Sequence, residues 1–256
     1  MTSVDVLGSF AGRHAVVTGS GSGIGRASAI ALAARGADVT LIARTSAALE
    51  HTAEEVRRHG MRAIVCPADV RDERAVEAAF ARASEHRTVD LLVTAAGINR
   101  PADLIDTPVS AITEMLETNI LGTLLTCRAF GRRLLDAGRP GAAVCLSSQM
   151  GSVGSPGRVT YCATKHAVNG VTKALSLEWA PFGIRVNAVA PTFIETAFTA
   201  PMLAVPSFRE EVLSRIPLGR IGQVADLDGV VCFLLSDAAG LVTGHVMAVD
   251  GGWTAQ

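Results

Sequence analysis

The sequence contains few charged and few aromatic residues. Charged residues make up 18% of its 256 positions and aromatic residues 4%, and there is a single tyrosine. The formal net charge is −1 and the sequence pI is about 6.6. Because no run of Lys or Arg interrupts this balance, the chain lacks the long-range attraction on which nucleic-acid binding depends. The composition therefore predicts a protein with no nucleic-acid partner.

Long apolar runs and paired cysteines are also missing. No stretch approaches the roughly 20 apolar residues that span a bilayer, and the opening MTSVDVLGSFAGRH has no basic segment followed by an apolar one, as a secretory signal would have. The six histidines are scattered, and the five cysteines never form a CxxC pair (Cys66, Cys127, Cys145, Cys162 and Cys232). These absences predict a cytoplasmic protein with reduced core thiols, no membrane partner and no metal site.

Apolar residues make up 49% of the chain, which excludes a disordered protein. Apolar runs of strand length alternate with amphipathic stretches of helix length almost from end to end. The predicted strands are His14–Thr18, Asp38–Ala43, Ala63–Cys66, Leu91–Ala95, Ala142–Ser147, Arg185–Val189 and His245–Val249. The predicted helices include Gly25–Arg35, Ser46–His59, Asp72–His86, Ile112–Asp136 and Tyr161–Ala180. Because continuous apolar strands are typical of parallel sheets, we expect one α/β domain over residues 1–256, a Rossmann-type doubly wound sheet of about seven strands with helices on both faces.

One segment, residues 192–219, departs from this alternation. It follows a predicted strand and mixes apolar, charged and proline residues in TFIETAFTAPMLAVPSFREEVLSRIPLG. Long connections at the carboxyl edge of a parallel sheet usually border the ligand crevice. We expect a substrate lid with a short helix near Ser207–Arg215; the alternative is a surface excursion that takes no part in binding.

A glycine-rich turn follows the first predicted strand. Residues Thr18–Gly25 read TGSGSGIG and lead directly into a predicted helix. Glycines let the backbone turn sharply and approach a pyrophosphate, whose charge then meets the helix N-terminus. Arg26 stands where a Walker A loop would have Lys, which excludes that motif. At this place the turn predicts dinucleotide binding, with a merely structural turn as the alternative.

The end of the second predicted strand indicates which dinucleotide is bound. A ribose with a free 2′-hydroxyl usually meets an Asp or Glu about 20 residues after the glycines, and here that place holds Ala43, Arg44 and Thr45. Asp38 is acidic but begins the strand, at the wrong end for the ribose. A guanidinium without a neighbouring carboxylate favours a 2′-phosphate through charge-assisted hydrogen bonds. We therefore expect NADP(H), with NAD(H) as the alternative if Arg44 is only a solvated surface residue.

The single tyrosine, Tyr161, lies four residues before Lys165. Positions i and i+4 share one face of a helix, so the phenol and the ammonium group can point into one site. A free phenol has a pKa of about 10. A nearby ammonium group, helped by a positive nicotinamide ring, lowers that pKa because it favours the phenolate. Such a phenol can exchange a proton with an alcohol or a ketone while a nicotinamide exchanges hydride.

Two further polar residues are candidates for the same site. Ser148 lies just beyond an apolar strand, where its hydroxyl can reach a substrate oxygen. Asn119, in an earlier helical stretch, can hold a water or a backbone group near Lys165. The structural alternatives are a helix cap for Ser148 and a solvated polar group for Asn119.

Together these residues resemble a known family. The chain is similar to the short-chain dehydrogenases/reductases over nearly its whole length, through TGxxxGxG at 18–25, Asn119, Ser148, YxxxK at 161–165, NAVAP at 187–191 and VDGG at 249–252.

The resemblance implies a role for each matching residue. Tyr161 would act as general acid/base, Lys165 would lower its pKa and hold the nicotinamide ribose, Ser148 would orient the carbonyl, and Asn119 would maintain a relay water. Family members are usually homotetramers. The cofactor-binding residues implied by the resemblance and by the turn above are Gly19, Ser22, Gly23, Ile24, Gly25, Arg44, Thr45, Asp69, Val70, Ala96, Gly97, Tyr161, Lys165, Pro191, Thr192, Ile194 and Thr196.

Two positions depart from the family's pattern. The family's Asn-Asn-Ala-Gly after the fourth strand is here Thr94-Ala95-Ala96-Gly97, which removes polar side chains that tie neighbouring strands together and puts local rigidity in question. The family's Pro-Gly after the sixth strand is Pro191-Thr192, where a threonine disfavours positive φ. Neither departure falls on a residue expected to exchange the proton.

Two sequence tracts and several polar residues indicate the class of substrate. The tracts EWAP at 178–181 and DGGWTAQ at 250–256 resemble dehydrogenases of sugar acids, sugars and polyols. Gln149 and Arg158 are candidates to bind substrate hydroxyls or a carboxylate, with structural or solvated roles as the alternatives. Apolar residues of the lid would instead suit a less polar substrate (Phe193, Phe198, Met202 and Phe208).

The chain also resembles 3-oxoacyl-(acyl carrier protein) reductases, whose carrier-docking surface uses two arginines. Arg139 matches one of them by its spacing before Ser148, but Phe182 occupies the place of the other. The leading prediction is therefore an NADP(H)-dependent oxidoreductase that interconverts a secondary alcohol and a ketone on a small sugar-acid, sugar or polyol substrate. The alternatives are a 3-oxoacyl thioester reductase and a dinucleotide-binding sensor or scaffold without turnover.

Overall fold

Seven parallel strands form the centre of the structure, a computed structural model that describes residues 9–255. The stretch considered above for a secretory signal lies mostly outside these residues. The strands are β1 (His14–Thr18), β2 (Asp38–Ala43), β3 (Ala63–Pro67), β4 (Leu91–Thr94), β5 (Gly141–Leu146), β6 (Ile184–Pro191) and β7 (Val246–Val249). Their order in the sheet is β3-β2-β1-β4-β5-β6-β7, and every neighbouring pair is parallel.

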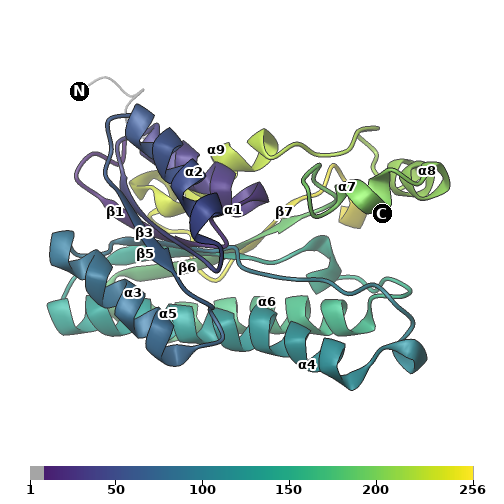
Figure 1. The fold of residues 1–256 in the computed structure, drawn as a ribbon, viewed down its shortest axis with the longest axis horizontal. Helices are drawn as coiled ribbons and strands as arrows, with labels where there is room; N and C mark the ends of the chain where they lie inside the picture. The colour runs from purple at the N-terminus through teal and green to yellow at the C-terminus, as the bar shows by residue number, and fades with distance from the viewer. Residues whose placement is uncertain (1–8, 256) are drawn as a thin grey trace.

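Helices cover both faces of this sheet. They are α1 (Gly23–Ala33), α2 (Ser46–Arg58), α3 (Glu73–His86), α4 (Val109–Leu116), α5 (Gly122–Ala137), α6 (Val159–Trp179), α7 (Ala200–Leu203), α8 (Pro206–Ser214) and α9 (Ala225–Leu235). Helices α1, α2 and α9 pack on one face and α3, α5 and α6 on the other, each group over its own buried apolar cluster (Figure 1). Within residues 9–255, no helix is both long and apolar enough to cross a membrane.

The predicted doubly wound α/β fold is confirmed. The strands begin and end within two residues of their predicted limits, because the apolar runs are continuous and, in the five strands between the edge strands β3 and β7, most side chains on both sheet faces are buried. Helix α9 is not among the predicted helices, since its sequence ADLDGVVCFLL is apolar around most of its circumference and has little amphipathic period. The predicted helix Ile112–Asp136 is also divided, by a π-helical turn at Glu117–Leu121 that joins α4 to α5.

The strand order reverses between β1 and β4, which lie side by side although β2 and β3 separate them in the sequence. Thr18 and Thr94, the last residues of the two strands, pair in register. The chain leaves these two strands toward opposite faces of the sheet, so a crevice remains at their carboxyl ends. The fold therefore places a ligand crevice between the glycine-rich turn after β1 and the loop after β4.

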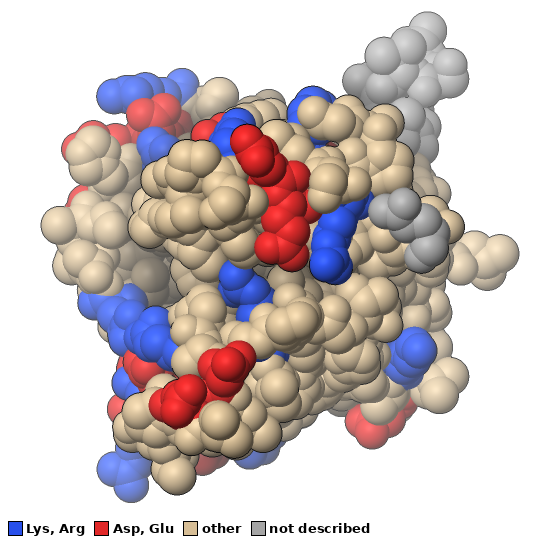
Figure 2. Space-filling view, turned by 90° about the vertical axis from the view of Figure 1, so that its right-hand side faces the viewer, with Lys and Arg blue, Asp and Glu red and all other residues tan. Residues whose placement is uncertain are grey.

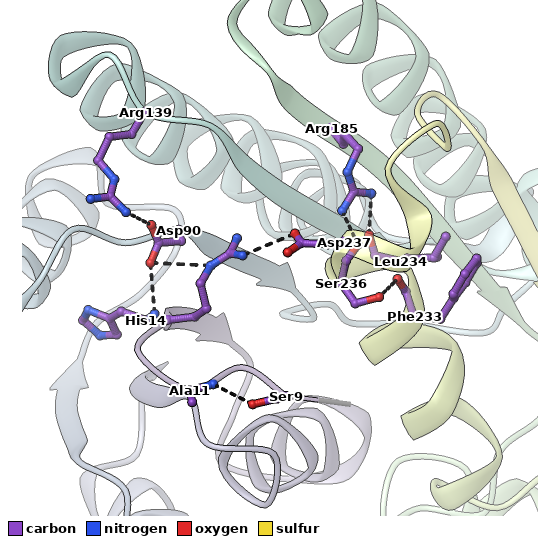
Figure 3. Close-up of polar contacts among 11 residues, drawn as sticks. Ser9, Ala11, His14, Asp90, Arg139, Arg185, Phe233, Leu234, Ser236 and Asp237 are labelled. Carbon is purple, nitrogen blue, oxygen red and sulfur yellow. Dashed lines mark hydrogen bonds and ion pairs between the residues drawn. The ribbon is translucent and has the colours of Figure 1, made fainter. Parts of the chain in front are cut away.

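Polar side chains join the segments at the amino ends of the strands, opposite the crevice (Figure 3). The buried carboxylate of Asp90 accepts hydrogen bonds from the backbone N–H of His14 (3.2 Å) and from the guanidinium of Arg139 (3.0 Å). The Arg13 guanidinium lies 3.8 Å from Asp90 and 3.5 Å from Asp237. The Arg139 side chain is thus part of an ion-pair network that holds the start of the sheet together.

Arg185, near the start of β6, stabilises the end of α9. Its guanidinium donates hydrogen bonds to the carbonyl oxygens of Leu234 (2.7 Å) and Ser236 (2.8 Å) (Figure 3). It donates more weakly to that of Val242 (3.3 Å). Carbonyl groups at a helix C-terminus have no partners within the helix, and a positive charge there also interacts favourably with the helix dipole.

Replacing Arg185 with Leu is expected to lower the free energy of unfolding by about 2–3 kcal/mol, because the carbonyl groups lose a charged donor. Equilibrium unfolding in urea measures the change. Arg57→Leu is a matched control, since Arg57 lies on the surface 3.3 Å from Glu50 and its loss should cost less than about 1 kcal/mol. Equal losses in the two variants would contradict the capping role of Arg185.

Candidate active site

One large cleft lies at the carboxyl ends of the central strands and has an empty volume of about 1660 Å³, its open mouth included. With the exception of Asn119, all predicted catalytic, cofactor and substrate residues line it: Gly19, Ser22, Gly23, Ile24, Gly25, Arg44, Thr45, Asp69, Val70, Ala96, Gly97, Ser148, Gln149, Arg158, Tyr161, Lys165, Pro191, Thr192, Ile194 and Thr196. Figure 2 shows the side of the molecule on which α7 and α8 lie, where acidic and basic residues occur in small, interspersed groups among neutral ones.

The glycine-rich turn can bind an anion. Gly19 has a φ of +67°, and a Cβ atom there would lie 2.7 Å from the backbone nitrogen of Ala96. A Cβ atom on Gly25 would lie 2.4 Å from the carbonyl oxygen of Gly19. The turn is therefore closely packed, and it leads directly into α1, whose first turn contains no acidic residue. Free N–H groups and the helix dipole at this N-terminus fit a pyrophosphate.

A guanidinium faces the cleft at the end of β2. Arg44 is exposed, lines the cleft and forms no ion pair with any carboxylate of residues 9–255. Asp69 is the nearby acid, but Arg71 binds its carboxylate (2.7 Å) and holds the pKa of Asp69 below its usual range. Asp38, at the other end of β2, pairs with His86 (2.7 Å). The charge available for a ribose substituent is therefore positive, which fits a 2′-phosphate.

Tyr161 and Lys165 lie one turn apart on α6, and both line the cleft. The Lys165 ammonium is buried, donates a hydrogen bond to the carbonyl oxygen of Leu146 (2.7 Å) and lies 5.6 Å from the centre of the Tyr161 ring. The Ser148 hydroxyl accepts a hydrogen bond from the backbone N–H of Met150 (3.1 Å) and is also hydrogen-bonded to the Tyr161 phenol. These contacts bring the phenol, the hydroxyl and the ammonium group into one corner of the cleft.

The prediction that Lys165 and a positive nicotinamide ring together lower the pKa of Tyr161 concerns the enzyme with bound cofactor, and in the protein alone this pKa is raised. Burial raises the pKa of Tyr161 to about 12, and the opposing effects come from the hydrogen bond with Ser148 and the charge of Arg158. Burial also lowers the pKa of Lys165 to about 8. Removal from water disfavours the charged form of each group, and in both cases it outweighs the opposing effects. The phenol is therefore protonated near neutral pH.

Asn119 does not line the cleft but supports its wall. Its side chain is buried within the π-helical turn, where the carbonyl oxygen accepts a hydrogen bond from the backbone N–H of Ile98 (2.8 Å). The amide nitrogen donates to the carbonyl oxygen of Ile98 (2.9 Å) and to the hydroxyl of Thr164 (3.0 Å). Asn119 thus joins the loop after β4 to α6, one residue before Lys165. The sequence indicated a backbone group as one possible partner of Asn119, but not that it belongs to Ile98, and it did not indicate Thr164, which lies inside the YxxxK motif.

The two departures from the family's pattern are accommodated by the backbone. The loop after β4 is held by hydrogen bonds from the N–H groups of Ala95 to the Thr18 carbonyl (3.2 Å) and of Ala96 to the Thr18 hydroxyl (3.4 Å). At Thr192 the φ angle is not positive, since within residues 9–255 only glycines have positive φ. The Thr192 hydroxyl is buried without a hydrogen-bond partner in the part of the chain that the structure describes, and it lines the cleft.

The segment predicted as a lid forms one wall of the cleft. It contains α8, within one residue of the predicted helix, and a second, short helix, α7, that the sequence pattern did not indicate. Phe193, Leu203 and Val212 belong to a buried apolar cluster against which Tyr161 packs. The sequence also did not single out Asn99, whose side-chain oxygen is buried without a hydrogen-bond partner among residues 9–255 and which lines the cleft.

Comparison with known proteins agrees with this geometry. A family model described as enoyl-(acyl carrier protein) reductase matches residues 19–254 of the chain. The chain is 40% identical over 245 residues to galactitol 2-dehydrogenase (L-tagatose-forming) of Cereibacter sphaeroides, with 95% of each chain covered. The chain belongs to the short-chain dehydrogenase/reductase family.

Further members of this family have similar sequences and structures. The chain is 40% identical over 248 residues to cis-4-hydroxycyclohexanecarboxylate dehydrogenase of Sinomonas cyclohexanicum, covering 96% of this chain and 98% of the relative. A putative 2-deoxy-D-gluconate 3-dehydrogenase of Agrobacterium tumefaciens, solved with bound NADP, has a TM-score of 0.91 at 38% identity, covering 97% of this chain and 98% of that one. The protein is thus a short-chain dehydrogenase/reductase that binds a nicotinamide dinucleotide and acts on CH–OH groups.

Proposed function

We propose that this enzyme uses NADP(H) to interconvert a secondary alcohol and a ketone on a small sugar-acid, sugar or polyol substrate. The observation that supports this most directly is the placement of Tyr161, Ser148 and Lys165 in one corner of the cleft whose other end has the glycine-rich turn and Arg44. These two groups of residues fit the two parts of a dinucleotide, with its phosphates at the glycine-rich turn and its reactive ring beside the Tyr161 phenol.

Each residue then has a chemical role. When bound, the nicotinamide supplies the hydride or accepts it. Tyr161 donates a proton to the carbonyl oxygen during reduction and removes it from the alcohol during oxidation. Ser148 donates a hydrogen bond to the same oxygen and orients it. Lys165, held by the carbonyl of Leu146, binds the nicotinamide ribose, and Asn119 positions the loop after β4.

The NADP(H) preference rests on the end of β2. Arg44 is an exposed guanidinium without an ion-pair partner in residues 9–255, and Asp69, an acid on which its charge acts, is bound by Arg71. A 2′-phosphate would therefore meet a positive charge and no competing carboxylate. Similar structures solved with NADP, among them the Agrobacterium protein above, also support this cofactor.

The substrate class rests on the relatives and on the cleft. The named relatives act on a polyol and on a hydroxylated ring carboxylate, and the Agrobacterium structure is named for a deoxy sugar acid. A reductase of 3-oxoacyl thioesters remains the second candidate, which the description of the matching family model favours. Against it, Phe182 is 57% exposed where a docking arginine was expected, and Arg139 is paired with Asp90.

We further propose a homotetramer in the cytoplasm. Helices α4 and α5 and the segment before them have several exposed large apolar side chains (Leu104, Ile105, Val109, Leu116, Leu121 and Leu124). Burial of such side chains against another copy of the chain would be favourable by about 25 cal/mol for each Å² of apolar surface removed from water.

Initial rates with NADPH and NADP⁺ test the proposed function. We expect measurable oxidation of sugar acids or polyols with NADP⁺, and reduction of the matching ketones with NADPH, above the rate of a Tyr161→Phe blank. Acetoacetyl thioester is included in the same panel with NADPH. A rate with the thioester that exceeds all others would replace the proposed substrate class by the acyl reductase, and no binding of either dinucleotide would contradict both.

A further inference from the structure

Arg158 is the one arginine of residues 9–255 that is buried, with 8% of its surface exposed. It immediately precedes α6, three residues before Tyr161, and lines the same cleft. Its guanidinium lies over the rings of Phe193 (5.7 Å to the centroid) and Phe208 (5.8 Å), and one of its nitrogens lies 3.2 Å from the sulfur of Met202. The aromatic rings therefore fix the position of this cation without neutralising its charge.

No carboxylate of the described chain forms an ion pair with Arg158. Glu211 is the acidic residue whose charge acts on it, but the Glu211 carboxylate pairs with Arg215 (3.5 Å). By contrast, the partly buried Arg133 has a carboxylate partner in Glu77 (3.0 Å). A desolvated cation without a counter-charge is unfavourable, and burial lowers the pKa of Arg158 accordingly. An anion that entered the cleft would provide the missing partner.

Two hydrogen-bond acceptors of the same cleft also have no partner among the described residues. The side-chain oxygens of Gln149 and Asn99 are buried without hydrogen bonds among residues 9–255, and both residues line the cleft. Gln149 is 2% exposed and directly follows Ser148. Such oxygens accept hydrogen bonds from hydroxyl groups, whereas a guanidinium donates two parallel bonds to a carboxylate. The Arg158 guanidinium can therefore bind a carboxylate, and the oxygens of Gln149 and Asn99 can accept hydrogen bonds from hydroxyl groups of the same molecule.

We propose that Arg158 binds the carboxylate of the substrate and that the enzyme selects hydroxy acids over neutral polyols. This inference rests on the proposed function, because Arg158 lies three residues before Tyr161, whose phenol exchanges the proton in that function. The phosphate-binding turn and Arg44 lie at the other end of the cleft, so Arg158 is a determinant of substrate rather than of cofactor. Phe193 and Phe208, both from the predicted lid, would hold the guanidinium plane while its N–H groups bind the two carboxylate oxygens.

Binding to the enzyme loaded with NADPH tests this without turnover, since an alcohol and a reduced cofactor cannot react. Calorimetry compares D-gluconate with D-gluconamide, and cyclohexanecarboxylate with cyclohexanecarboxamide. The two ligands of each pair have the same carbon skeleton and differ only in having a carboxylate or a neutral amide. We expect each carboxylate, or the one whose carbon skeleton fits the cleft, to bind about 30- to 100-fold more tightly than its amide. This range is typical of a charge-assisted pair.

Arg158→Gln is expected to abolish this preference, and Arg158→Lys to keep part of it, while both variants retain the affinity for NADPH. Arg220→Gln is the matched control, because Arg220 is an exposed arginine paired with Asp226 (2.6 Å), and it should keep the full preference. Thermal unfolding of each variant shows whether it is folded, and Arg158→Lys preserves the charge over the aromatic rings if Arg158→Gln does not fold.

Three results would overturn the inference: amides that bind as tightly as carboxylates, no saturable binding of any carboxylate, or a preference that survives in Arg158→Gln. These results are distinct from failure of the proposed function. An enzyme that oxidises polyols with NADP⁺ but shows no preference for carboxylates keeps that function and lacks this site. An enzyme that binds carboxylates through Arg158 but never turns over an alcohol or ketone has the site without the function.

Discussion

Replacing Tyr161 with Phe is expected to lower kcat about 1000-fold while the dissociation constant for NADPH stays within about twofold. General acid/base catalysis contributes roughly 100- to 10,000-fold in rate, and the substitution removes only the oxygen that exchanges the proton. The ring still packs against the apolar cluster of the lid, so the cleft should keep its shape. Steady-state rates and NADPH fluorescence titration measure the two quantities.

The same residue has a spectroscopic signature, because the chain contains one tyrosine. Phenolate absorbance should appear only as the pH approaches the raised pKa of about 12, and the signal should be missing from Tyr161→Phe. Addition of NADP⁺ should move the ionisation to lower pH, since a positive ring beside the phenol favours the phenolate. Retention of activity in Tyr161→Phe, with or without the shift, would disprove the assigned mechanism.

Replacing Arg44 with Asp is expected to lower the ratio of kcat/KM for NADPH to that for NADH by about 100-fold or more. Loss of a guanidinium–phosphate pair accounts for roughly 10- to 100-fold, and the new carboxylate repels the 2′-phosphate while it can accept a hydrogen bond from a free 2′-hydroxyl. Rates with both cofactors at several concentrations give the ratio.

A matched control separates this effect from a general change in surface charge. Arg62 is also exposed, but it precedes β3 at the opposite edge of the sheet and does not line the cleft. Arg62→Asp should leave the cofactor ratio unchanged. An unchanged ratio in Arg44→Asp as well would exclude Arg44 from cofactor selection.

The sequence by itself determined the fold and most residues of the cleft. Continuous apolar strands that alternate with helical stretches are typical of a parallel sheet covered on both faces, and a glycine-rich turn between strand and helix is typical of phosphate binding. Thr18–Gly25, Arg44 and the Tyr161–Lys165 pair were therefore identifiable from residue type and spacing. Each of these features depends on residues that are close together in the sequence, so their types and spacing can be recognised without the structure.

Only the tertiary structure decided how the groups in the cleft affect one another. Burial, rather than the charge of Lys165, dominates the pKa of Tyr161, and burial depends on every element packed around the phenol. Asn119 turned out to hold the backbone of Ile98 and the hydroxyl of Thr164, contacts that join distant parts of the chain. Arg158 became informative only when its exposure and its partners were known. Desolvation and long-range pairing have no fixed spacing in a sequence, because they arise from which segments meet after the chain has folded.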